Sequence, residues 1–234
     1  MSRTAAEPAP TPRPAATVVL VDGRAPWRVL LVRRPATASF GPGRLVFPGG
    51  AVDAGDELLG EPERVAAVRE LFEEAGMLLA RTENGQRARA REQQALRSAV
   101  DSGLTFQQGL LRLGLRPDLA RLAPLARIVT PPWRPRRFDT HFYIAQRPSG
   151  QSVIPQIGEV TDWTWASAAQ LGADLDAPLM VPTRAVLAWV GEQEDIVAFI
   201  ARRRRRRRPP LAVSPAPHAD DDPWPGWLGP WPPP

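Results

Sequence analysis

The chain has 234 residues, a formal net charge of +5 and no cysteine. The lack of cysteine excludes disulfides, thiolate-bound zinc and a cysteine nucleophile. Because only two histidines are present, any bound metal is expected to be a hard cation held by oxygen ligands. No apolar run reaches the roughly 18 residues that cross a bilayer, and the N-terminus lacks a secretory signal. No membrane span and a cytoplasmic location are therefore expected.

The two ends of the chain differ in composition from its centre. Residues 1–15 are rich in proline and alanine and are expected to form a disordered tail, whereas 16–201 is expected to be one folded domain. Residues 202–234 begin with seven consecutive arginines (202–208), which exceed the whole net charge, and continue into a proline- and tryptophan-rich tail that is also expected to be disordered. The arginine run is either a solvated extension of the preceding helix or a contact for nucleic acid or an anionic surface.

The first part of the domain has the composition of strands. Residues 17–22 and 27–34 are rich in β-branched and aliphatic side chains and are expected to pair as a hairpin. A further short strand over 45–52 is expected to be interrupted at Pro48-Gly49-Gly50.

Helices are expected next. Pro62 suits the first turn of a helix, and Gly76 is placed where a helix cap belongs. Residues 83–122 are expected to form a helical insertion, with one helix over 86–100 and another from Thr105 to Leu113.

Three more strands are expected, over 124–130, 137–145 and 157–165, before a final helix from Pro182 to about Ala201. Strands interleaved with helices predict an α/β sandwich with a central mixed sheet.

Residues 69–77, R-E-L-F-E-E-A-G-M, place three carboxylates within five residues. On a helix, an apolar stripe lies on one side, and Glu70, Glu73 and Glu74 lie on the opposite side. The helix is therefore expected to bury one face and to project all three carboxylates from the other. Arg69 is the flanking cation and reaches Glu73 at i, i+4. The acidic face is either solvated or a cation site.

The spacing around this stretch resembles the Nudix box, G-x5-E-x7-R-E-U-x-E-E-x-G-U, in which U is aliphatic. Gly55 and Glu61 fit the pattern when the box is counted from Gly55. Phe47-Pro48-Gly49-Gly50 is similar to the loop that ends with the first glycine of the box in that family. Counted from Gly50, the spacing leads to Asp56, with five residues inserted afterwards, and we favour this count.

The resemblance to Nudix hydrolases implies a Nudix-type α/β/α sandwich and metal-dependent hydrolysis of a diphosphate bond. Divalent cations suit this reaction because they neutralise diphosphate charge and acidify water. Under the resemblance, Mg²⁺ or Mn²⁺ would be bound by Glu70, Glu73, Glu74 and the carbonyl of Gly50.

The resemblance also assigns roles to other residues. Glu70 and Glu74 would be catalytic, together with Glu159, which lies where the family often places a late glutamate as a further ligand or base. The residues that would orient or shape the site are Arg69, Glu61, Gly55 and Gly76.

Residues 30–50 are similar to a motif of coenzyme A diphosphatases, L-L-T-x-R-[SA]-x3-R-x3-G-x3-F-P-G-G. Leu30, Leu31, Arg34, Gly43 and the F-P-G-G loop agree with it; the departures are Val32, Pro35 and Ser39. Residues 130–145, T-P-P-W-R-P-R-R-F-D-T-H-F-Y-I-A, resemble the peroxisomal-type members of that group.

This second resemblance implies hydrolysis of coenzyme A or acyl-coenzyme A to 3′,5′-ADP and 4′-phosphopantetheine or its acyl derivative. Arg34 and Arg137 would contact the substrate, although at most one of the adjacent Arg136 and Arg137 can face a cleft from a strand. The alternatives are hydrolysis of ADP-ribose, NADH or a nucleoside triphosphate, and a non-catalytic module that binds nucleic acid. A homodimer is also left open.

Overall fold

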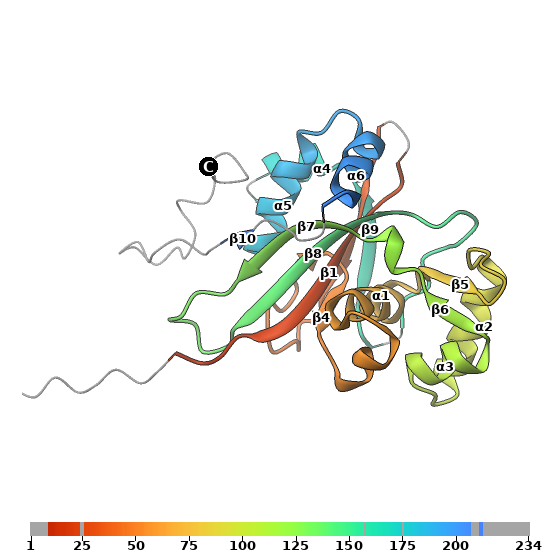
Figure 1. Cartoon of the computed structure of the whole chain (residues 1–234). Coiled ribbons are helices and arrows are strands. Elements are labelled where there is room, and N and C mark those ends of the chain that lie inside the picture. Colours follow the sequence, from red (N-terminus) through yellow and green to blue (C-terminus); the bar gives the residue numbers. More distant parts are fainter. Residues whose placement is uncertain (1–8, 24–25, 157, 175, 207–210, 213–234) are drawn as a thin grey trace, which may run out of the picture.

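The central sheet is built around β1 (Arg13–Val21), which pairs with three other strands in a computed structural model of the chain (Figure 1). The structure describes residues 9–23, 26–156, 158–174, 176–206 and 211–212. β1 is antiparallel to β2 (Val29–Arg33) and to β4 (Gly49–Ala51), and it is parallel to β8 (Phe138–Gln146). The sheet is therefore mixed, as predicted.

Other strands extend this sheet on both sides, in the order β10-β7-β8-β1-β2-β3, with β9 also paired to β2. Their bounds are β3 (Leu45–Val46), β7 (Ala123–Val129), β9 (Asp162–Ala166) and β10 (Leu211–Ala212). The predicted hairpin is confirmed by the pairing of Val21 with Val29. Pro48 separates β3 from β4, so the predicted interruption is confirmed too.

Both faces of the sheet are covered, because alternate residues of β1 enter two different hydrophobic clusters. Ala16 and Val18 belong to the cluster that contains α1 (Pro62–Ala75). Val19 and Val21 belong to the cluster that contains α5 (Val181–Gly191) and α6 (Ile196–Arg204). The architecture is therefore the α/β/α sandwich that the sequence predicted.

The insertion packs beside α1 (Figure 1), and Leu96, Phe106 and Leu110 join the same hydrophobic cluster as that helix. β5 (Ala80–Thr82) and β6 (Leu115–Pro117) form a separate two-stranded sheet, and the chain between them folds into α2 (Ala90–Asp101) and α3 (Phe106–Arg112). Thr105 caps α3 as expected, since its side chain accepts a hydrogen bond from the backbone of Gln108 at 3.2 Å. The remaining short elements are η1 (Ala54–Leu59), η2 (Leu119–Arg121) and α4 (Ala168–Ala173).

Several predicted boundaries are wrong. Residues 13–15 are not part of a disordered tail, because they begin β1 and pair with both β4 and β8. The final helix is two helices, α5 and α6, since Asp195 caps a new helix by accepting a hydrogen bond from the backbone of Ala198 at 2.9 Å. The strand expected over 157–165 begins only at Asp162.

The first part of the arginine run belongs to the folded domain. α6 continues to Arg204, and Arg203 is buried, where it donates hydrogen bonds of 2.8 Å to the carbonyls of Pro124 and Leu125 and lies over the ring of Trp189. A disordered tail starting at residue 202 is therefore wrong, and Arg203 is used for packing. Most of the tail, residues 207–210 and 213–234, lies outside the described residues.

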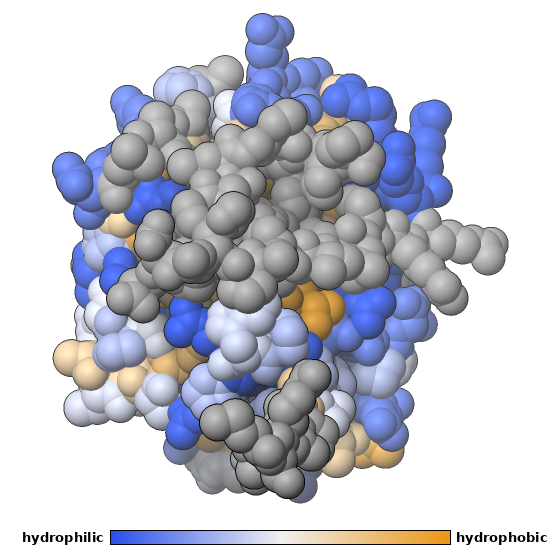
Figure 2. Space-filling model, turned by 90° about the vertical axis from the view of Figure 1, so that its left-hand side faces the viewer, coloured by the Kyte–Doolittle hydropathy of each residue, from blue (hydrophilic) through white to orange (hydrophobic). Residues whose placement is uncertain are grey.

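In the described part of the chain, no helix is long and apolar enough to cross a membrane. One end of the molecule is shown in Figure 2, where the coloured surface is mainly hydrophilic with smaller hydrophobic areas.

Candidate active site

The helix that carries the acidic stretch is fixed at both ends by its sequence. Pro62 occupies the first turn of α1, where its missing N–H costs no hydrogen bond. Gly76 follows the last turn with φ 70° and donates to the carbonyl of Phe72 at 2.7 Å. A Cβ at Gly76 would lie 2.3 Å from the carbonyl oxygen of Ile154, so glycine is required both by the backbone angle and by this close approach.

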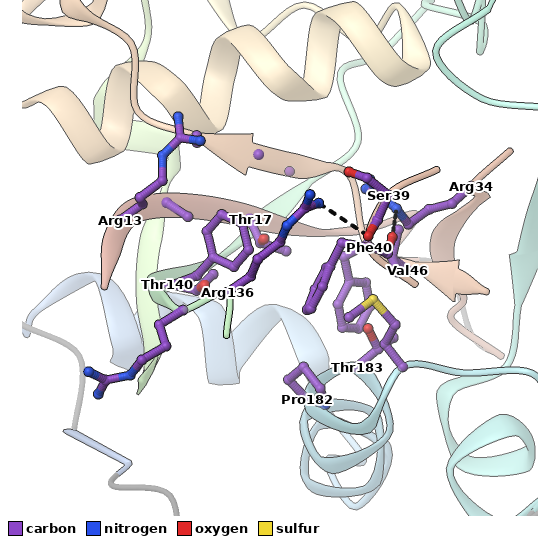
Figure 3. A pocket seen from close by; sticks show the side chains of 18 of the residues that line it. Arg13, Thr17, Arg34, Ser39, Phe40, Val46, Arg136, Thr140, Pro182 and Thr183 are labelled. Atoms are coloured by element: carbon purple, nitrogen blue, oxygen red, sulfur yellow. Dashed lines mark hydrogen bonds between the residues drawn. The ribbon is translucent and has the colours of Figure 1, made fainter. Parts of the chain in front are cut away.

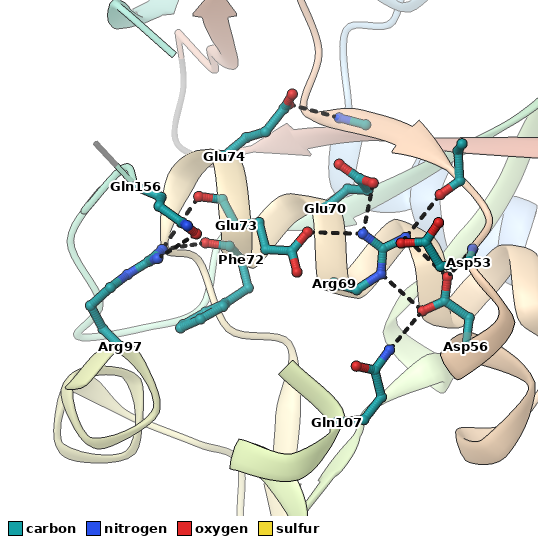
Figure 4. A network of polar contacts seen from close by, with 12 residues as sticks. Asp53, Asp56, Arg69, Glu70, Phe72, Glu73, Glu74, Arg97, Gln107 and Gln156 are labelled. Atoms are coloured by element: carbon teal, nitrogen blue, oxygen red, sulfur yellow. Dashed lines mark hydrogen bonds and ion pairs between the residues drawn. The ribbon is translucent and has the colours of Figure 1, made fainter. Parts of the chain in front are cut away.

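Arg69 is the centre of a buried polar network (Figure 4). Its Nη1 donates to Oε1 of Glu70 at 2.7 Å and to Oε2 of Glu73 at 2.8 Å. Its Nε and Nη2 each donate at 3.0 Å to one carboxylate oxygen of Asp56, and Nη2 also donates to the carbonyl of Ala51 at 2.8 Å. Burial alone would lower the pKa of Arg69, but the hydrogen bond to Asp56 and the surrounding carboxylates raise it above its ordinary value.

The network favours counting the box from Gly50. Asp56 is fully buried and paired with Arg69, whereas Glu61 has a side chain that is 74% exposed and pairs with Arg64 at 3.2 Å. Glu61 therefore lies at the start of α1 and is not part of the Arg69 network. Gly55, which the other count needs, lies in η1 beside Gln107.

The strand β4 runs directly against two of the three glutamates. A Cβ at Gly50 would lie 2.4 Å from Oε1 of Glu70, so the glycine lets the backbone approach this carboxylate without displacing it. The backbone N–H of Gly49 donates to Oε2 of Glu74 at 3.0 Å. The glycine pair thus brings a backbone edge into contact with the acidic helix.

The expectation that the acidic face of the helix is not a buried face is wrong. Glu74 is 6% exposed, and the side chains of Glu70 and Glu73 are 15% and 27% exposed. Helix periodicity shows which residues share a face, but it does not show that β4 covers that face.

Burial perturbs all three glutamates. It raises the pKa of Glu70 to about 7, against the lowering effect of Arg69. Burial, with the negative charge of Glu70, raises the pKa of Glu74 to about 8, although the N–H of Gly49 and the charge of Arg34 act in the opposite direction. Burial also raises the pKa of Glu73. A divalent cation beside these groups would favour their charged forms.

The donor set suits a hard cation, because it consists of carboxylate and backbone oxygens. Among the residues that the structure describes, however, no three acidic or histidine side chains converge on one point. The reason is visible in Figure 4, where Arg69 is hydrogen-bonded to both Glu70 and Glu73, while Glu74 turns to Gly49. Arg69 uses only one oxygen of each of these carboxylates, so binding of one ion by all three glutamates would require their side chains to move closer together.

The insertion supports the acidic network at two places that the sequence did not reveal. From α2, the buried Arg97 donates to the carbonyl of Phe72 at 2.6 Å and to Oε1 of Gln156 at 3.2 Å, and it lies over the ring of Phe72. From α3, Gln107 donates to Asp56 at 3.2 Å. Arg97 therefore donates to a carbonyl in the last turn of α1 and connects this turn to the segment that leads to Glu159.

Glu159 is exposed and lies in a turn just before β9, where its backbone donates to the carbonyl of Gln156 at 3.2 Å. Its negative charge contributes to the raised pKa of Glu73 and of Glu74. Glu159 therefore lies within electrostatic reach of the acidic helix, but it forms no hydrogen bond with the Arg69 network.

A cavity of about 730 Å³ lies on the other side of β4 (Figure 3). Gly49, Gly50 and Ala51 line it, whereas none of the three glutamates does. Its floor consists of alternate residues of β1 and β8 that pair in register: Arg13 with Phe138, Ala15 with Thr140 and Thr17 with Phe142. β4 thus separates the acidic helix from this cavity and contacts both.

Arg34 and Arg137, the two residues expected to contact the substrate, both line this cavity, but their side chains are held by different numbers of hydrogen bonds. Arg34 donates to the carbonyl of Phe40 at 2.8 Å and is near enough to Glu74 to lower its pKa. Arg137 donates to the carbonyls of Thr130 and Pro10 at 3.0 and 2.6 Å, so its guanidinium is tied to backbone. Arg136, which was not selected from the sequence, extends across the cavity to the carbonyl of Ser39 at 3.2 Å (Figure 3).

Comparisons with known proteins agree with this fold. A family model described as the NUDT19 Nudix domain matches residues 62–176. A Caenorhabditis elegans protein classed as nudix hydrolase 7 is 36% identical over 156 residues, which are 65% of this chain and 50% of that protein, so the chain spans about half the length of this curated relative. The crystal structure of a NUDIX hydrolase from Alicyclobacillus acidocaldarius is 28% identical, with a TM-score of 0.71, over 82% of this chain and 96% of that one.

In its fold, its acidic helix and these matches, the chain is similar to the Nudix hydrolases. Within that family it resembles the NUDT19-type subgroup.

Proposed function

We propose that this chain hydrolyses the diphosphate bond of coenzyme A or acyl-coenzyme A. The products would be 3′,5′-ADP and 4′-phosphopantetheine or its acyl derivative. Support comes from the match to the NUDT19 Nudix domain and from the resemblance of residues 30–50 and 130–145 to coenzyme A diphosphatases. The observation that carries the proposal is that β4 contacts Glu70 and Glu74 on one side and lines an arginine-rich cavity on the other.

In this arrangement the diphosphate would lie along the Gly49–Gly50 edge of β4, with Arg34 beside it. A divalent cation, Mg²⁺ or Mn²⁺, held by Glu70, Glu73, Glu74 and the carbonyl of Gly50, would neutralise diphosphate charge and acidify water. Arg69 would orient Glu70 and Glu73 through the hydrogen bonds it already makes.

Hydrolysis forms one bond from a water oxygen to phosphorus and breaks the bridging phosphorus–oxygen bond, while a proton leaves the water. A carboxylate within hydrogen-bond reach of the attacking water would accept this proton, and Glu70 and Glu74 are two candidates. Glu159 is a third candidate to accept the proton, because it lies at the rim of the same acidic region.

The test is turnover of a panel containing coenzyme A, an acyl-coenzyme A, ADP-ribose, NADH and a nucleoside triphosphate, with products identified by mass spectrometry. We expect coenzyme A or its acyl ester to be preferred, activity to disappear in EDTA, and Mg²⁺ or Mn²⁺ to restore it. Glu74→Gln keeps the shape of the side chain and should lower turnover roughly a hundredfold or more.

Other outcomes would change the proposal in defined ways. Faster hydrolysis of ADP-ribose, NADH or a nucleoside triphosphate would overturn coenzyme A as the proposed substrate but would still support diphosphate hydrolysis. Activity that persists in chelator would overturn the metal-dependent mechanism. A cytoplasmic location, a homodimer and nucleic-acid binding by the arginine run stay predictions from the sequence.

A further inference from the structure

The cavity beside β4 continues into a second one of about 760 Å³. Both are lined by Phe40, Arg136, Phe138 and Met180, so they form one elongated groove. The rings of Phe40 and Phe138 lie 5.4 Å apart at the shared wall and offer aromatic surface to a planar group. β4 borders only the first cavity, so the second lies farther from the acidic helix.

In the described part of the chain, the positive charge of this groove is not matched by ion pairs. Six arginines line it: Arg13, Arg34, Arg44, Arg134, Arg136 and Arg137. Within the described ranges, no aspartate or glutamate lines either cavity, and none of the six arginines takes part in an ion pair. A concave surface with one sign of charge concentrates the field and attracts ligands of the opposite charge.

The arginines divide between the two cavities. Arg34 lines only the first, beside the proposed diphosphate position. Arg44 and Arg134 line only the second, and Arg136 lines both. The side chains of Arg44 and Arg134 are exposed and form no hydrogen bond or ion pair with the part of the chain that the structure describes.

A diphosphate bound near a divalent cation would leave the charge of the second cavity unmatched. A phosphate monoester adds about −1.5 to −2 charge at pH 7 and three strong acceptor oxygens, which suit guanidinium donors. We propose that the second cavity binds a phosphate monoester on the nucleoside of the substrate, recognised by Arg44, Arg134 and Arg136. This inference rests on the proposed function and identifies the part of the groove that would distinguish coenzyme A from diphosphates without such a phosphate.

The first experiment compares kcat/KM for coenzyme A and for dephospho-coenzyme A, which differ only in the 3′-phosphate. The wild-type ratio should be about tenfold to a hundredfold, the range for a hydrogen bond to a charged group. Arg134→Ala, Arg44→Ala and Arg136→Ala should each reduce that ratio. Arg112→Ala, at an exposed arginine of α3 away from the groove, is the matched control and should leave the ratio unchanged.

The second experiment measures binding without turnover, by calorimetric titration of 3′,5′-ADP, 2′,5′-ADP and AMP. Either bisphosphate should bind at least about tenfold more tightly than AMP, and the preferred isomer identifies the position of the phosphate. Equal binding of all three, or a coenzyme A preference that Arg44→Ala and Arg134→Ala leave intact, overturns the inference. Rapid hydrolysis of both coenzyme A forms at equal rates would overturn it and keep the proposed function. Tight bisphosphate binding without coenzyme A hydrolysis would overturn the proposed function and keep the inference about the second cavity.

Discussion

Arg69 and Asp56 are joined by two hydrogen bonds of 3.0 Å, from Nε to Oδ1 and from Nη2 to Oδ2, and both side chains are buried. Asp56→Asn should therefore lower the free energy of unfolding by roughly 3 kcal/mol, because it leaves a buried guanidinium incompletely paired. The matched control is Glu61→Gln, which removes the exposed partner of Arg64 and should cost less than about 1 kcal/mol. Urea denaturation followed by circular dichroism measures both, and a larger cost for Glu61→Gln would favour a box that begins at Gly55.

Gly50 is expected to control the position of Glu70. In Gly50→Ala the new Cβ would lie 2.4 Å from Oε1 of Glu70, so the carboxylate must move. Affinity for Mn²⁺ should fall about tenfold to a hundredfold, as for groups that orient metal ligands. Gly55→Ala is the control, since its Cβ would meet the end of the Gln107 side chain at 3.1 Å, which can shift. Titration of Mn²⁺ by electron paramagnetic resonance tests this, and equal affinities of the two variants would remove Glu70 from the site.

The raised pKa values of Glu70 and Glu74, about 7 and about 8, make stability depend on pH. Between the unfolded value near 4.5 and these folded values, the native state binds more protons than the unfolded state. The stabilisation is therefore complete below about pH 4.5 and is lost as the pH rises through about 8.

In EDTA, Tm should accordingly fall between pH 5 and 8.5, and Glu74→Gln should make the fall shallower. Saturating Mg²⁺ should raise Tm most at the upper end of this range, because metal ligands must be deprotonated. Differential scanning fluorimetry across the pH series measures these effects. An identical pH dependence in Glu74→Gln and wild type would show that Glu74 does not carry a raised pKa.

Arg97 is expected to matter for both stability and turnover, because it ties α1 to the segment before Glu159. Arg97→Met keeps much of the packing against Phe72 but removes the hydrogen bonds to carbonyl groups, and it should cost about 2 kcal/mol. Turnover should fall more than substrate affinity, and Arg97→Lys should recover part of it. Arg91→Met, on the same helix with a side chain that is 93% exposed, is the control and should behave like wild type. Unchanged kcat in a folded Arg97→Met variant would show that this arginine contributes to stability and not to turnover.

Several features of the site follow from short-range patterns and were predicted correctly. The helix from Pro62, the cap at Gly76 and the Arg69–Glu73 contact depend on residues within one or two helical turns. Spacing along a helix sets such contacts directly, because the period of 3.6 residues is the same in every α-helix. The hairpin of the first two strands and the cap at Thr105 are local in the same sense.

Other features depend on segments that meet only after the sheet has formed. Asp56 pairs with Arg69, β4 buries Glu74, and Arg97 reaches α1 from 25 residues away. The expectation that at most one of Arg136 and Arg137 faces a cleft is wrong, because both precede β8 and both line the groove. No local period encodes these contacts, since they depend on register between strands and on where the insertion packs. The positions of the three glutamates along α1 can therefore be predicted from the sequence, whereas their burial and their partners depend on the folded arrangement.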